Sequence, residues 1–159
     1  MKCVVPIGDM KIASRPDQLV TDALGSCLCL TAYDPISGMG GLLHAMLPLS
    51  KVNLKKAETN PFMFVDTGIP ALFEQFAAQE NVSPKPNWLV KAIGCGNPMG
   101  HKEVFQIGER NYRVLCERLL NEGIRCKAED IGGTASRTVC LDLATGQTIV
   151  SSNGIERVL

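Results

Sequence analysis

Short apolar runs separated by turn sequences are the feature that most limits how this 159-residue chain can fold. The run Leu28–Tyr33 is followed by the turn residues Asp34-Pro35 and Ser37-Gly38. A second apolar run, Gly41–Leu47, then ends at Pro48. Two runs of strand length around such a turn predict a β-hairpin.

Other runs of strand length occur along the rest of the chain. They predict strands at Val4–Ala13, Trp88–Gly94 and Ile124–Ile131, and a final hairpin formed by Arg137–Leu143 and Gln147–Ser152. The polar segment Leu49–Pro61 is predicted to be a surface loop. Because strands outnumber helices and hairpins outnumber βαβ connections, the pattern favours the α+β class over a doubly wound sheet.

Two segments carry apolar residues at helical spacing. The first helix is predicted to begin with Thr67 as its cap, and the second to span Glu109–Glu122 and stop at Gly123. Cys116 falls on the apolar stripe of the second helix and is therefore predicted to be a core residue.

The length and the charge balance limit the kinds of partner. A chain of this length is expected to form one compact domain with one sizeable core. Sixteen Lys and Arg residues balance sixteen Asp and Glu residues, so no nucleic-acid partner is expected and the partner is a protein or a small molecule. No apolar run approaches the ~20 residues that span a bilayer, so we expect no membrane insertion and a cytoplasmic location.

Seven cysteines are an odd number in a chain that is not small, so free thiols are expected and not a disulfide framework. There is no C-x-x-C pair, and His101 near Cys95 is a weak combination, so no metal site is expected. Cys29 is predicted to be a core residue that turns away from Cys27, to the opposite face of the strand.

Cys27 and His44 are the candidate catalytic residues. Cys27 follows Gly25-Ser26, a small-residue step that permits a sharp turn before a strand. A neighbouring imidazole can accept the proton of a thiol and so produce the nucleophilic thiolate. A turn centred on Ser37 would separate Cys27 and His44 by about three residues, or ~10 Å, whereas one centred on Pro35-Ile36 would place them opposite each other.

A structural interpretation of the same two residues is also open. A free cysteine is among the most buried residue types, and a single histidine on an apolar strand is commonly a core residue. The periodicity does not choose between the two registers of the hairpin. Spacing alone therefore leaves both the catalytic and the structural interpretation standing.

A set of motifs extends over nearly the whole chain. They are Thr21, Leu24-Gly25-Ser26-Cys27, Asp34, Gly38, His44, Leu47-Pro48, Ile107-Gly108-Glu109-Arg110-Asn111, Glu129-Asp130-Ile131-Gly132-Gly133 and Thr145-Gly146. In order and spacing this set resembles the CheD family, the receptor-modifying glutamine deamidases of bacterial chemotaxis. The resemblance implies that residues 1–159 form a single CheD-like cysteine hydrolase domain, built as two packed mixed β-sheets flanked by helices in an α/β/β/α sandwich.

The resemblance also implies roles for individual residues. Cys27 would be the nucleophile, His44 the general base and acid, and Thr21 the third member that orients the histidine. Backbone N–H groups near Ser26 and Cys27, in the turn that Gly25 permits, are expected to stabilise the oxyanion. Such a mechanism requires no metal and no cofactor.

The expected substrates are specific glutamines in the cytoplasmic domain of chemoreceptors (methyl-accepting chemotaxis proteins), and in some family members glutamyl methyl esters as well. An alternative function is that of an adaptor that docks on a CheC-type chemotaxis phosphatase and tunes its activity. The alternative does not exclude catalysis.

Two loops depart from the family pattern. Gly94–Gly100 reads GCGNPMG where the family usually has Gly-Gly-Ala followed by Met and an apolar residue. Thr134 follows Gly132-Gly133 where family members often carry Asn. The loops Leu49–Pro61 and Gly94–Gly100 are the candidates for the rim of the substrate groove.

Overall fold

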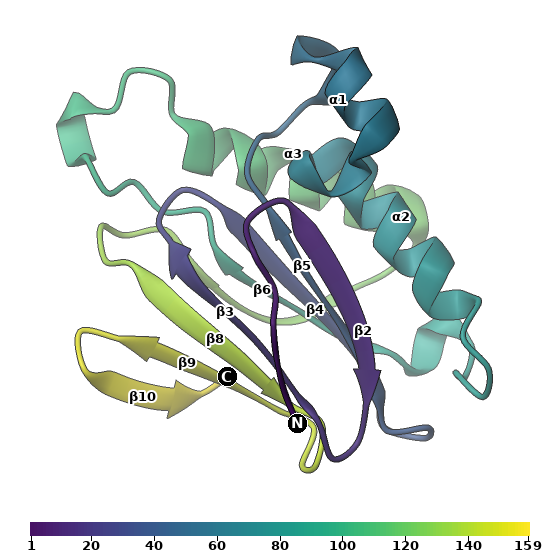
Figure 1. Ribbon diagram of the computed structural model, residues 1–159. Helices are drawn as coiled ribbons and strands as arrows, with labels where there is room; N and C mark the ends of the chain where they lie inside the picture. The colour runs from purple at the N-terminus through teal and green to yellow at the C-terminus, as the bar shows by residue number, and fades with distance from the viewer.

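Two five-stranded β-sheets pack face to face in the computed structural model, which describes residues 1–159 (Figure 1). The first, here called the open sheet, has the order β1 (Lys2–Val4), β3 (Gln18–Leu24), β8 (Arg137–Asp142), β9 (Gln147–Ser152) and β10 (Ile155–Val158). The second, the helix-covered sheet, has the order β2 (Asp9–Ser14), β5 (Met39–Ala45), β4 (Leu28–Asp34), β6 (Leu89–Gly94) and β7 (Cys126–Ile131). Each sheet is mixed, because β1 runs parallel to β3 and β6 runs parallel to β7.

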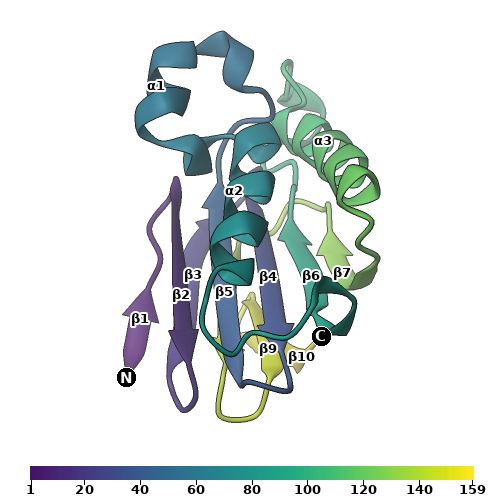
Figure 2. The same ribbon diagram turned by 90° about the vertical axis from the view of Figure 1, so that its right-hand side faces the viewer.

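The helices all lie on the outer side of the helix-covered sheet (Figures 1 and 2). They are α1 (Leu54–Thr59), α2 (Val65–Ala77) and α3 (Ile107–Glu122). The predicted α+β class with two packed mixed sheets is confirmed. The layers follow the order α/β/β, and not the expected α/β/β/α, because the outer face of the open sheet carries no helix. None of the helices is both long enough and apolar enough to span a membrane.

Strand β4 separates two apolar cores and is buried along its whole length. Its residues Leu28, Leu30 and Ala32 pack on the side of α2 and α3. Cys29 and Tyr33 pack on the other side, in the layer between the two sheets. A strand that is buried on both faces is expected to be mostly apolar, which explains the apolar run Leu28–Tyr33, in which Thr31 is the polar exception.

Several element boundaries differ from the prediction. The run Val4–Ala13 is not one strand, because a turn with a left-handed Gly8 divides it into β1 and β2, which belong to different sheets. Leu49–Pro61 is not a plain loop, since Asn53 caps the short helix α1 with its side chain. Helix α2 begins at Val65 and not after a Thr67 cap.

Helix α3 ends at Gly123 as predicted, and the glycine adopts the left-handed conformation. Its buried face, however, is rotated from the predicted stripe. The buried residues are Gly108, Asn111, Val114, Leu115 and Leu119. Cys116, predicted to be a core residue, is exposed.

The hairpin of β4 and β5 is closed by a buried carboxylate. Asp34 is fully buried and accepts hydrogen bonds from the Ile36 N–H, the Ser37 hydroxyl, and both the N–H and the hydroxyl of Ser83. Burial alone would raise the pKa of Asp34, but the hydrogen bonds from Ser83, Ser37 and Ile36 outweigh it and lower the pKa to about 2. The side chain therefore ties the hairpin turn to the segment before β6.

We expect Asp34→Asn to lower the free energy of unfolding by about 3 kcal/mol at pH 7, because an amide would donate toward groups that now all donate to the carboxylate. Urea denaturation followed by circular dichroism measures the change. Asp142→Asn is the matched control, since Asp142 closes the β8–β9 turn with a hydrogen bond from Ala144 only. Equal losses in the two variants would contradict this account of Asp34.

Candidate active site

Thr21 and His44 meet in the layer between the two sheets. Thr21 lies on β3 of the open sheet and His44 on β5 of the helix-covered sheet, and both are buried. The Thr21 hydroxyl oxygen lies 2.6 Å from His44 Nδ1. One hydrogen bond therefore joins the two sheets at this point.

The hydrogen-bond partners determine which ring nitrogen of His44 carries the proton. The Thr21 hydroxyl has one hydrogen, and it donates this hydrogen to the Val5 carbonyl at 2.6 Å, an oxygen that can only accept. The bond between Thr21 and His44 must then be donated by Nδ1–H. This leaves Nε2 unprotonated, and Nε2 has no hydrogen-bond partner, so the free nitrogen of His44 is available as a base.

Cys27 occupies a position diagonal to His44. The ladder between β4 and β5 ends at the pair Leu28–Ala45, and His44 lies opposite Cys29. Cys27 precedes the strand by one residue and belongs to the same inter-sheet core as Cys29. Diagonal neighbours of this kind are separated by about 7–8 Å across a sheet, within reach of a longer side chain.

Neither predicted register of the hairpin is correct. The structure pairs Asp34 with Met39, so the turn is centred between Ile36 and Ser37, one step from the Ser37-centred register. Cys29 is a core residue as predicted, but it does not turn away from Cys27, because residues two apart on a strand share a face. The structure records no direct hydrogen bond between Cys27 and His44.

Both candidate catalytic groups are uncharged at neutral pH. Burial lowers the pKa of His44 to about 4, although the nearby Asp22 carboxylate opposes the shift. Burial also raises the pKa of the Cys27 thiol, with partial compensation from its own backbone N–H. The resting site therefore holds a neutral thiol and a neutral imidazole, not a preformed ion pair.

The backbone of Cys27 rests on the segment that follows β6. The Cys95 N–H donates to the Cys27 carbonyl at 2.8 Å, and the Gly96 N–H donates to the Gly25 carbonyl at 2.8 Å. At Gly94, which has φ +106°, a Cβ atom would lie 2.3 Å from the Cys27 carbonyl oxygen. Glycine at this position is thus required for the close approach of the two segments.

The turn before β4 leaves two backbone donors without a backbone acceptor. The N–H groups of Ser26 and Cys27 do not donate to any backbone carbonyl, whereas the neighbouring Gly25 N–H donates to the Ala23 carbonyl. Ala23 has a left-handed φ of 57°, which sharpens this turn. Neither N–H group is therefore committed to the backbone hydrogen-bond network at this turn.

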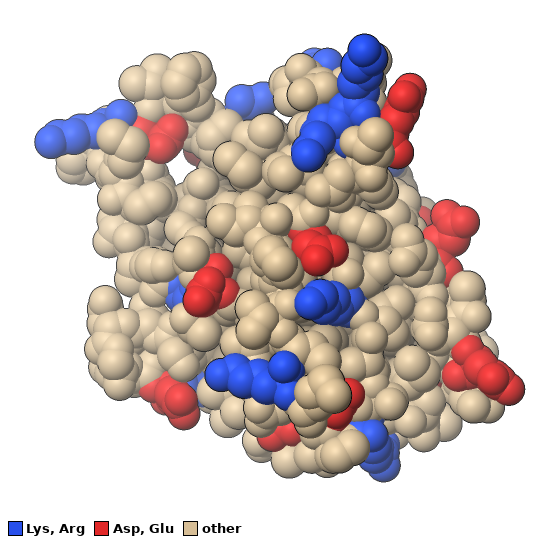
Figure 3. Space-filling view, in the orientation of Figure 1, with Lys and Arg blue, Asp and Glu red and all other residues tan.

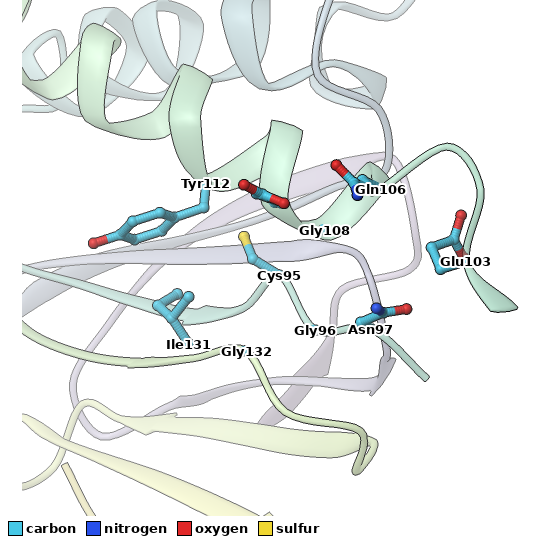
Figure 4. Close-up of a pocket in the computed structure, with 10 residues that line it drawn as sticks. Cys95, Gly96, Asn97, Glu103, Gln106, Gly108, Tyr112, Ile131 and Gly132 are labelled. Carbon is cyan, nitrogen blue, oxygen red and sulfur yellow. The ribbon is translucent and has the colours of Figure 1, made fainter. Parts of the chain in front are cut away.

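A cavity of about 270 Å³ lies on the helix side of the same segment (Figure 4). It is lined by Cys95, Gly96, Asn97, Glu103, Gln106, Gly108, Glu109, Tyr112, Ile131 and Gly132. The Cys95 sulfur points toward α3 in this view, and Cys95 belongs to the core beneath the helices. Cys27 does not line the cavity and belongs to the inter-sheet core, so the cavity and the candidate nucleophile lie on opposite sides of the helix-covered sheet.

The remaining titratable groups form no second site of the same kind. Burial raises the pKa of Cys95 to about 12, so this thiol stays protonated at neutral pH. No group of three or more His, Cys, Asp or Glu side chains is arranged to hold a metal ion. Acidic and basic side chains are interspersed over the face shown in Figure 3, in line with the balanced composition.

Comparisons with known proteins identify the family. The profile of the CheD family, described as CheD chemotactic sensory transduction, matches residues 46–152. The chain is 40% identical over 157 residues to the probable chemoreceptor glutamine deamidase CheD of Solibacter usitatus, which covers 98% of this chain and 92% of that protein. It is 38% identical over 152 residues to the probable chemoreceptor glutamine deamidase CheD 1 of Syntrophus aciditrophicus, covering 95% and 94%. The chain belongs to the CheD family.

The predicted resemblance is thereby confirmed over nearly the whole chain. The family profile begins two residues after His44, so the candidate residues precede the matched segment. The alignment with the Solibacter usitatus protein covers 98% of the chain and so includes the region around these residues. The catalytic roles of Cys27, His44 and Thr21 remain predictions. The geometry of the site indicates which atom of His44, Nε2, would act as the base.

The lowered pKa of His44 predicts a pH dependence of stability. The folded pKa, about 4, lies below the usual value of 6.5, so between these values the unfolded chain binds more protons than the folded chain. Stability should therefore rise with pH across this window, and His44 should contribute about 2 kcal/mol between pH 4.5 and 7. Urea denaturation of wild type and His44→Gln at several pH values measures this, and identical slopes for the two proteins would contradict it.

Proposed function

We propose that this protein hydrolyses the side-chain amide of specific glutamines in chemoreceptors to glutamate, through Cys27, His44 and Thr21. One observation carries the proposal: Thr21 bonds to Nδ1 of a buried His44, and this leaves a free Nε2 in the layer that also contains the Cys27 side chain. Membership in the CheD family supports the substrate, since its relatives are named chemoreceptor glutamine deamidases.

In the first half of the reaction, His44 Nε2 accepts the thiol proton while the Cys27 sulfur attacks the glutamine carboxamide carbon. Because thiol and imidazole are both neutral at rest, the proton moves as the C–S bond forms. The backbone N–H groups of Ser26 and Cys27 stabilise the oxyanion of the tetrahedral intermediate. The Nδ1–H bond to Thr21 holds the ring in the tautomer that the step requires.

The second half uses the proton that His44 has gained. Nε2–H protonates the leaving nitrogen, the C–N bond breaks, and ammonia departs from a thioester on Cys27. A water molecule then gives its proton to Nε2 and attacks the thioester carbonyl, and the sulfur leaves and recovers its proton. The product is glutamate with no net redox change, and a glutamyl methyl ester would follow the same steps with methanol as the leaving group.

The exposed side chains of the loop after β6 support a docking role for this region. Met99, Val104 and Phe105 are all largely exposed, and the loop projects from the body of the molecule (Figure 1). The first residues of the same loop hold the Cys27 backbone. A receptor helix that docks on these apolar side chains would lie close to the nucleophile. Met99 belongs to the predicted rim at Gly94–Gly100, and Val104 and Phe105 extend the proposed surface beyond it.

The proposed chemistry predicts a mass change in the substrate. Wild type should add about one mass unit to particular glutamines of a receptor cytoplasmic domain, because OH replaces NH₂, whereas Cys27→Ala and His44→Ala should lose this activity. Peptide mass spectrometry after incubation measures the change. Thr21→Val should reduce kcat by about 10- to 100-fold because it removes the oriented tautomer, while Thr21→Ser keeps the hydroxyl and serves as its control.

The outcome also separates the two candidate functions. Modification by Cys27→Ala at the wild-type rate would contradict the proposed nucleophile. If wild type leaves several receptor domains unmodified, docking on a CheC-type phosphatase becomes the leading hypothesis. Binding of Cys27→Ala to such a phosphatase would then test it, since this substitution leaves the docking surface intact.

Substitutions in the projecting loop should separate recognition from chemistry. Phe105→Ser should raise the KM for the receptor domain by about tenfold, the value of one buried aromatic anchor, with little change in kcat. Alkylation of Cys27 by iodoacetamide should keep its wild-type rate in this variant. Leu120→Ser is the control, because Leu120 is at least as exposed as Phe105 but lies near the far end of α3. An unchanged KM in Phe105→Ser would remove this side chain from the docking surface.

A further inference from the structure

Asn111 of α3 contacts the backbone next to Cys27 and the backbone next to His44. Its side chain is fully buried, and Nδ2 donates to the Ser26 carbonyl at 2.9 Å and to the Met46 carbonyl at 3.1 Å. Ser26 immediately precedes Cys27, and Met46 follows His44 by two residues. One amide group from a separate element therefore holds the segment of the nucleophile and the strand of the base at the same time.

The two carbonyls lie just beyond the point at which the hairpin ladder stops. The pairing of β4 with β5 ends at Leu28 and Ala45, so no ladder bond continues to Cys27 and Met46. The Met46 N–H donates instead to the Met63 carbonyl, outside the hairpin. The two donors of the Asn111 amide thus replace the cross-strand bonds that are missing at the place where the two catalytic residues must keep their spacing.

Gly108, one helical turn before Asn111, sets how closely α3 approaches the segment that supports Cys27. Gly108 lies on the same face of α3, three residues before Asn111. A Cβ atom at Gly108 would lie 2.0 Å from the Gly96 carbonyl oxygen and 2.7 Å from that of Cys95. The start of α3 therefore rests directly on the backbone that also supports Cys27 (Figure 4).

The choice of side chain at this position is not explained by helix packing alone. The neighbouring buried positions of α3 carry Val114 and Leu115, which fill the core without polar atoms. Asn111 Oδ1 has no hydrogen-bond partner, and an unsatisfied buried acceptor costs about 1–3 kcal/mol. An apolar residue of similar shape would avoid this cost but would leave the Ser26 and Met46 carbonyls without the Asn111 donors, so the amide at this position serves those two contacts.

We propose that Asn111 is a positioning residue for catalysis, which fixes the distance and orientation of Cys27 relative to His44 through the Ser26 and Met46 carbonyls. The proposal rests on the proposed function for its kinetic consequence. Asn111 does not touch the substrate and acts through the two backbone segments that it joins.

The test substitutes Asn111→Leu, which keeps the branched shape and the number of heavy atoms of the side chain and removes both donors. Because an error of about 1 Å in the position of catalytic groups can cost 10²-fold in rate, we expect kcat for receptor deamidation to fall by about 10- to 100-fold with KM within about twofold of wild type. We also expect the pH profile of Cys27 alkylation, measured by mass spectrometry of the peptide that contains it, to shift from that of wild type. Asn111→Gln, which returns the amide on a longer arm, should recover part of kcat.

Leu115→Ala is the matched control, because it removes buried packing from the same helix without touching either carbonyl. It should lower the melting temperature while leaving kcat and the alkylation profile close to those of wild type. If folded Asn111→Leu shows the wild-type kcat and alkylation profile, or if Leu115→Ala loses as much activity, Asn111 is a packing residue and the proposal is wrong. Should Asn111→Leu fail to fold, Asn111→Ala, which introduces no new bulk, takes its place.

The two readouts separate this proposal from the proposed function. If wild type deamidates no receptor domain, the proposed function fails, yet the alkylation profile of Cys27 still compares Asn111→Leu with wild type and with Leu115→Ala. An unchanged profile would then overturn the role of Asn111 by itself.

Discussion

The hydrogen bond between Thr21 and His44 is the interaction on which the candidate site depends. It crosses from one sheet to the other, so the ring orientation of the histidine is set only when both sheets have packed. The Val5 carbonyl determines which group donates in this bond. It accepts the only hydrogen that the Thr21 hydroxyl can donate, so the hydrogen between Thr21 and His44 comes from His44 Nδ1. The tautomer of His44 is in this way a consequence of tertiary structure and not of the hairpin that carries it.

Two buried side chains at the candidate site each keep one polar atom without a hydrogen-bond partner, which costs free energy. His44 is fully buried with one ring nitrogen unpartnered, and Asn111 is fully buried with its amide oxygen unpartnered. Proteins seldom leave such atoms unpaired in an apolar layer, since each forfeits a hydrogen bond that water would have made. Asp34, by contrast, is equally buried but fully paired. Of the four unpaired buried side-chain atoms, two belong to His44 and Asn111, and the other two are Asn97 Oδ1 and Arg137 Nη1.

Local sequence patterns predicted the hairpin and the second helix with its Gly123 end, and they indicated Cys27 and His44 as candidates. Thr21 was added only by the resemblance to the CheD family. The local patterns could not fix the register, because the turn between Asp34 and Met39 tolerates several centres and only the packed structure selects one. They also missed the role of Asn111, since a polar residue on a helix is normally assigned to solvent. The pattern Gly108, Asn111, Leu115 does have helical spacing, and the buried face would have been found had the small and polar residues been counted with the apolar ones.

Strand assignment failed where a short turn separates strands of different sheets. Nothing in the run Val4–Ala13 shows that β1 pairs with β3 whereas β2 pairs with β5, because partners that distant in sequence leave no local signal. Cys116 was misplaced for a related reason: on a helix that is covered on one side only, a rotation of one position moves a residue from core to solvent.

The segment that follows β6 has two parts that differ in how closely they contact the backbone around Cys27. Gly94, Cys95 and Gly96 hold the backbone of the nucleophile, at spacings that exclude a side chain at either glycine. Further along the loop, Met99, Val104 and Phe105 are exposed to solvent. A change in the distal part of this loop can therefore alter its surface without moving the Cys27 backbone, whereas a side chain at Gly94 or Gly96 would collide with backbone carbonyl oxygens.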